Sequence, residues 1–168
     1  MRRRNLRILS GISGLCLVAI IFVAGPVAAR SQSGHGDVLA AHLVGSAESP
    51  GVPNGSGRAV VTLKPGSQTV CFRLSWSGIG VVTAAHIHVG AAGVAGPIVV
   101  PFFNNQSMPD TISGVEGCVH GVDAGLIAKI HDTPSDYYVN VHTTDFPTGA
   151  IRDQLQHKGK GNGHGSNT

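Results

Sequence analysis

A run in which every second residue is large and apolar is the feature that most restricts the fold of this chain. Between residues 70 and 76, Val70, Phe72, Leu74 and Trp76 alternate with smaller or polar residues. Side chains of a β-strand point alternately to its two faces, so this spacing predicts a strand with one face in a core. A similar run at 59–63 lies just upstream, and the Lys-Pro-Gly-Ser turn between the two predicts a hairpin.

Further short β-type runs follow along the chain, separated by residues that favour turns. Together they give about eight expected strands, at 37–44, 59–63, 70–76, 82–90, 97–103, 115–120, 136–143 and 150–155. One short helix is expected after Asp123, which is a suitable N-cap for the segment AGLIAKI. The sequence therefore predicts an all-β fold, an antiparallel Greek-key-like β-sandwich of about eight strands with one short helix.

The two ends of the chain differ in composition from its body. Residues 1–29 combine a basic start, an apolar run and small residues up to Ala29, which is typical of a cleaved signal peptide. The alternative is an uncleaved membrane anchor, but the clean apolar run of about ten residues is short for a bilayer span. We expect a flexible lead-in at 30–36, a folded domain at 37–156 and a disordered tail containing Gly and His at 157–168.

The net charge of +3 belongs to the precursor rather than to the expected mature protein. Four of the twelve basic residues are Arg2, Arg3, Arg4 and Arg7, and their removal leaves eight basic residues against nine acidic ones. Nucleic-acid-binding domains carry a basic patch of their own. We therefore expect no nucleic acid as a partner.

Two cysteines, Cys71 and Cys118, remain once the leader is removed. An even number of cysteines in an exported protein favours a disulfide between them. The alternative is a pair of reduced, buried thiols.

Three segments of the chain resemble the CHRD domain, a family named after its occurrence in chordin. They are LVGSAESPGVPNGSGRAVVTL at 43–63, AHIH with the following GPIVVPFF in 85–103, and YVNVHTTDFPTGAIRDQL at 138–155. The resemblance covers roughly residues 37–156 and departs from the usual final segment at Ala150 and Asp153. It implies an all-β extracellular domain, in a family where most members have no assigned reaction.

His86, His88 and His142 form the most informative cluster of side chains. In a strand, His86 and His88 project from the same face about 7 Å apart, and His142 lies on another strand with a polar face. If these strands are neighbours, three imidazoles meet, a set that suits Cu or Zn. The His-x-His pair also resembles, locally, the paired copper ligands of copper–zinc superoxide dismutases. The alternative is a hydrogen-bonded polar layer that needs no metal and that also includes Asn140, Arg152 and Gln154.

No Gly-x-Ser-x-Gly motif or phosphate-binding loop occurs, so catalysis is not expected. Our first interpretation is an extracellular or cell-surface binding module, secreted or periplasmic, whose partner is an unidentified extracellular protein or glycan. Membrane attachment is expected only through a retained leader. The alternative is a Cu- or Zn-binding or redox domain that uses the three histidines. A purely structural component of the cell envelope is the third option.

Overall fold

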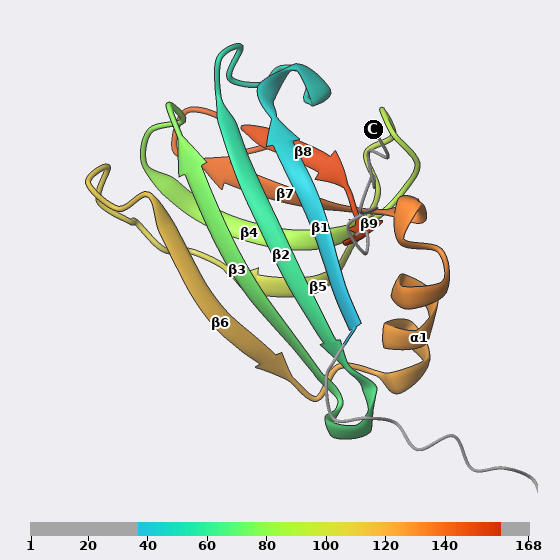
Figure 1. Ribbon diagram of the computed structural model, residues 1–168. Helices are drawn as coiled ribbons and strands as arrows, with labels where there is room; N and C mark the ends of the chain where they lie inside the picture. The colour runs from blue at the N-terminus through green and yellow to red at the C-terminus, as the bar shows by residue number, and fades with distance from the viewer. Residues whose placement is uncertain (1–36, 159–168) are drawn as a thin grey trace, which may run out of the picture. The chain divides into compact units, whose positions relative to one another are not determined.

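The computed structural model describes residues 37–158 as one antiparallel sheet with a single α-helix (Figure 1). The predicted signal peptide, the lead-in and the tail from residue 159 lie outside the described residues. The nine strands are β1 (Asp37–Val44), β2 (Ser56–Lys64), β3 (Thr69–Ser77), β4 (Val82–Val89), β5 (Ile98–Phe103), β6 (Gly114–His120), β7 (Tyr137–Thr143), β8 (Ile151–Gln154) and β9 (Gln156–His157). The helix α1 spans Ala124–Asp132, and three 3-10 turns lie at η1 (Gly45–Ala47), η2 (Pro65–Ser67) and η3 (Pro134–Asp136).

The strands follow the order β5-β4-β7-β8-β1-β2-β3-β6, with β9 paired to β1. The sheet bends between β8 and β1, where one residue pair, Val44 with Arg152, joins the two strands. Figure 1 shows the result as two layers, with β1, β2, β3 and β6 crossing in front of β4, β5, β7 and β8. At the other side Phe72 of β3 stacks on Phe102 of β5, with ring centroids 4.4 Å apart. The all-β class and the single short helix are thus confirmed, in a nearly closed sheet.

The core lies between the two layers and is built by the alternation seen in the sequence. Leu39, Val61 and Leu74 from the front layer and Ile87 and Val139 from the back layer are each at most 1% exposed. Each strand contributes its alternate residues, so its other side chains face outward. This geometry places His86, His88 and His142 on the outer face of the back layer.

Helix α1 closes one end of the domain. Asp123 Oδ1 accepts a hydrogen bond of 2.8 Å from the backbone N–H of Leu126, which confirms Asp123 as the N-cap. Ile127 and Ile130, three residues apart on one helix face, are buried. No helix among residues 37–158 is long and apolar enough to cross a membrane.

The last strand is the main difference from the expected elements. Gln156 and His157 pair with Ala40 and Leu39 of β1, whereas a disordered tail was expected to start at His157. Two polar residues carry no alternation to reveal a strand. The backbone of β1 provides the partner, which the local sequence does not show.

Candidate metal centre

The three histidines lie side by side on the outer face of the back layer. His86 and His88 alternate on β4, and the register of the neighbouring β7 places His142 opposite Ala84. One ring nitrogen from each histidine lies within 4.8 Å of the others. The rings of His86 and His142 are the nearest pair, with centroids 4.9 Å apart.

These histidines are buried although they point away from the core. His86 is 4% exposed, and His88 and His142 are each 8% exposed. Segments that follow the strands supply their outer contacts: residues 90–97 after β4, Asn104 after β5, and Pro147 after β7. A small polar interior therefore lies between the sheet and its loops, on the side opposite the main core.

Each histidine directs one ring nitrogen to an oxygen acceptor outside the cluster. His88 Nδ1 donates to the carbonyl of Gly96 at 2.8 Å, and His142 Nδ1 donates to the carbonyl of Pro147 at 3.0 Å. His86 Nε2 donates to Asn104 Oδ1. With the Asn104 amide oriented so that its Oδ1 faces His86, none of these oxygens carries a proton, so the three ring nitrogens that contact them do. The second nitrogen of each neutral imidazole is left with a lone pair.

The remaining three nitrogens therefore carry lone pairs, and no hydrogen-bond donor among residues 37–158 faces them. His86 Nδ1 lies 3.1 Å from His142 Nε2, so two lone pairs face each other. His88 Nε2 is buried and has no hydrogen-bond partner among residues 37–158. Two lone pairs at this distance repel unless a proton or a cation lies between them. Two ligands of a tetrahedral zinc ion, each about 2.0 Å from the metal, are themselves about 3.3 Å apart, close to the observed spacing.

Burial keeps the imidazoles neutral. It lowers the pKa of His142 from 6.5 to about 4, and the hydrogen bond to the Pro147 carbonyl opposes only part of that effect. Burial also lowers the pKa of His86 and His88. A proton between His86 and His142 is thus disfavoured near neutral pH, whereas neutral imidazoles are the form that binds metals.

A second set of buried polar groups adjoins the histidines. Tyr138 stacks on His88, and the guanidinium carbon of Arg152 lies 4.6 Å from the centre of the Tyr138 ring. Arg152 Nε is 3.6 Å from Glu48 Oε1, and both side chains are at most 10% exposed. Burial raises the pKa of Glu48, although Arg152 lowers it in part.

The CHRD domain model matches residues 39–155, which is well over half of the chain. The chain belongs to the CHRD domain family. No curated protein matches the chain, and no solved structure does. The match runs from Leu39 within β1 to Leu155 after β8 and includes every residue of the histidine cluster.

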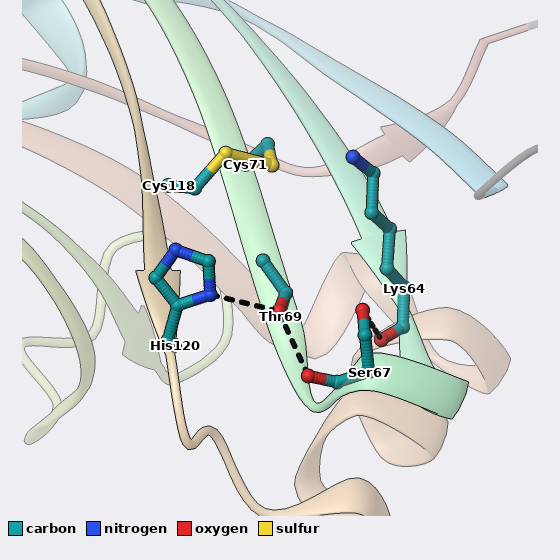
Figure 2. The surroundings of a disulfide bond; sticks show 6 residues. All are labelled: Lys64, Ser67, Thr69, Cys71, Cys118 and His120. Atoms are coloured by element: carbon teal, nitrogen blue, oxygen red, sulfur yellow. Dashed lines mark hydrogen bonds between the residues drawn. A yellow bond between two sulfur atoms is a disulfide. The ribbon is translucent and has the colours of Figure 1, made fainter.

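The disulfide of this CHRD domain joins β3 to β6 on the outer face of the front layer (Figure 2). Cys71 and Cys118 are directly opposite each other in the register, so the predicted pairing is confirmed. Beside them His120 contacts Thr69, with 3.2 Å between Nδ1 and Oγ1, and Thr69 donates to the Ser67 carbonyl. The bond is compatible with an extracellular or periplasmic location.

The CHRD fold brings the other predicted polar-face residues to the same side as the histidines. Asn140 pairs in register with both His86 and Arg152, so these three residues form one row across β4, β7 and β8. Gln154 lies at the margin, where its amide donates to the carbonyls of Gly90 and Ser135. The polar-layer interpretation and the metal-site interpretation therefore involve the same face.

Sequence reasoning missed the groups that orient the imidazoles. Asn104 lies directly after the apolar strand at 97–103, where a polar residue reads as an ordinary loop start. Glu48 is the one acidic residue of the loop at 45–57 and has no motif around it. The Gly96 and Pro147 acceptors are backbone carbonyls, which leave no signal in a sequence.

Proposed function

We propose that the domain binds a copper or zinc ion through His86 Nδ1, His88 Nε2 and His142 Nε2. The observation that carries this proposal is the pair of facing lone pairs on His86 and His142, 3.1 Å apart, beside the unpartnered His88 Nε2. The three nitrogens lie within 4.8 Å of one another, so a small movement of the rings lets one metal ion accept all three lone pairs. Three imidazoles whose other ring N–H each donates a hydrogen bond to an oxygen match the usual outer arrangement of histidine metal ligands.

The chemistry that follows is binding by three neutral nitrogen ligands with a further coordination position left over. Imidazole suits both zinc and copper, and an open position is the mark of sites at which a metal meets another ligand. A copper ion held there would also supply redox chemistry. The residues themselves hold the ion, keep it from bulk water and fix the orientation of the three rings.

Metal stoichiometry of the full-length exported protein tests the proposal. The metal-free protein is dialysed against copper or zinc, and the bound metal is measured by elemental analysis. We expect about one ion per chain, lost in His88→Ala and retained in His120→Ala, a matched change of an exposed histidine on β6. Equal metal content in wild type and His88→Ala would contradict the site.

Partner binding is the second candidate, and a specific feature of the front layer favours it. A hollow of about 480 Å³ lies over β2, β3 and β6, and Arg73 and Glu116, which pair at 2.8 Å, are among its lining residues. A hollow that combines an ion pair with apolar side chains such as Val60 and Phe72 suits a protein or glycan partner outside the cell. A glycan array probed with wild type and with an Arg73→Ala/Glu116→Ala variant tests this. Loss of a defined glycan signal in the variant supports it, and the same signals from both proteins contradict it.

We infer that the protein is exported, which rests on the leader at 1–29 and on the disulfide. Sequencing the N-terminus of protein recovered from the host envelope or medium tests this, with Arg30 expected as the first residue. A mature protein that begins at Met1 would contradict cleavage.

A further inference from the structure

The surroundings of the histidine cluster contain almost no negative charge. The three imidazoles are neutral near pH 7, and the groups that accept their outer N–H bonds are two backbone carbonyls and one side-chain amide. Zinc sites commonly place carboxylates in these outer positions, where they offset the charge of the ion. An ion held here would keep its full charge in a buried setting.

The charged side chain at the end of the stack formed by His88 and Tyr138 is Arg152, a cation. Arg152 lies over one ring, that of Tyr138, and Tyr138 lies against His88 with centroids 4.8 Å apart and an interplanar angle of 11°. Arg152 is 5% exposed, so water screens its charge poorly.

Glu48 offsets Arg152 only in part. The separation of 3.6 Å between Glu48 Oε1 and Arg152 Nε is longer than a direct hydrogen bond, and Glu48 Oε1 has no hydrogen-bond partner among the described residues. Arg152 lies over the ring of Tyr138, which itself stacks on His88, and it pairs with Glu48 only at 3.6 Å. The fixed charge beside the cluster is therefore positive.

We propose that the histidine cluster takes Cu(I) in preference to Zn(II), and that Arg152 is the residue that sets this preference. The inference rests on the proposed metal site. A fixed positive charge repels a divalent ion twice as strongly as a monovalent one at the same place. Cu(I) is also stable with three ligands, whereas zinc takes a fourth.

Paired titrations of the metal-free, full-length protein test the proposal. Cu(I) affinity is measured without oxygen by competition with a chromogenic Cu(I) chelator, and Zn(II) affinity by competition with a zinc indicator. Wild type should bind Cu(I) more tightly than Zn(II). In Arg152→Met the Zn(II) affinity should rise about tenfold and the Cu(I) affinity about threefold. The repulsion that is removed, and with it the change in the logarithm of the affinity, is twice as large for a divalent ion as for a monovalent one.

Three further variants separate charge from packing. Arg152→Lys keeps the charge and should keep the wild-type preference. Glu48→Gln removes the partial offset and should weaken Zn(II) more than Cu(I). Glu48→Gln/Arg152→Met removes both charges without leaving a buried acid unpaired, so it provides the measurement if Arg152→Met does not fold.

The outcomes distinguish this inference from the function on which it rests. Tighter binding of Zn(II) than of Cu(I) by wild type, or equal changes of both affinities in Arg152→Met, would overturn the inference and leave the metal site standing. Failure of both ions to bind wild type would overturn the metal site and the inference together.

Discussion

The ring of Tyr138 lies flat against the imidazole of His88, and its hydroxyl accepts a 3.0 Å hydrogen bond from the backbone N–H of Gly96. The carbonyl of the same glycine accepts a hydrogen bond from His88 Nδ1–H. Tyr138 and His88 thus fix one point of the loop at 90–97 by two bonds in opposite directions. The orientation of a candidate metal ligand and the position of the loop that covers it depend on each other.

Removal of the Tyr138 hydroxyl should loosen this loop. Tyr138→Phe keeps the stacked ring but leaves the Gly96 N–H without its acceptor, which should lower the free energy of unfolding by about 1 kcal/mol. Urea denaturation measures the loss, and faster hydrogen exchange at the Gly96 amide locates it. Tyr137→Phe is the matched control, since the Tyr137 ring packs in the main core. Equal exchange rates in wild type and Tyr138→Phe would show that the bond does not hold the loop.

Gly96 should tolerate no side chain. A Cβ at this position would lie 1.6 Å from the carbonyl oxygen of Val89, so Gly96→Ala must move the loop and with it the acceptor of His88 Nδ1. Loss of an outer-shell partner of a histidine ligand typically weakens metal affinity by about 10- to 100-fold. Gly66→Ala is the control because a Cβ at residue 66 meets nothing within 4 Å. Unchanged copper and zinc affinities in Gly96→Ala would argue against a role of the loop in the site.

The metal-free protein should lose stability as the pH falls from about 6.5 toward 4. The pKa of His142 is about 4 in the folded protein against an ordinary 6.5, so within this window the unfolded chain binds more protons than the folded one. Stability is then highest above pH 6.5, and the loss due to His142 is roughly 3 kcal/mol once both forms are protonated. His86 and His88, with lowered pKa values, act in the same direction.

Urea unfolding of metal-free protein at a series of pH values measures this dependence. His142→Gln removes one of the titrating groups and should make the curve less steep between pH 4 and 6.5. His120→Gln, a change of an exposed histidine on β6, is the matched control. An equally steep curve in His142→Gln would mean that other groups cause the loss.

The disulfide should stabilise the fold through the chain it closes. Cys71 and Cys118 are 47 residues apart, and closing a loop of that length contributes about 4 kcal/mol by restricting the unfolded chain. Cys71→Ser/Cys118→Ser should unfold at correspondingly lower urea, and the wild-type protein under reducing conditions should match it. A midpoint unchanged by both treatments would refute this contribution.

Local alternation was enough to predict most of the fold. Val70 to Trp76 indicated a strand with one buried face, and the same rule placed His86 and His88 together on the other face of their strand. That β4 and β7 are neighbours depends on how the whole sheet is ordered. From the sequence alone, His142 was therefore expected beside His86 and His88 only if their strands were neighbours.

Burial of this outward face was harder to predict. Alternation gives His86 and Arg152 the appearance of solvent-facing residues, yet both are at most 5% exposed because loops cover them. The path of a loop depends on contacts between distant segments, such as that of Asn104 with His86. No local pattern around Glu48 or Asn104 records those contacts.

Anomalous diffraction from crystals of the protein soaked with copper or with zinc tests the central claim most directly. Data collected on both sides of the metal absorption edge locate the ion without reference to any assumed ligand. The account predicts one peak bonded to His86 Nδ1, His88 Nε2 and His142 Nε2, about 2.0 Å from each. A metal peak elsewhere on the domain, with the His86 and His142 rings still in direct contact, would contradict it.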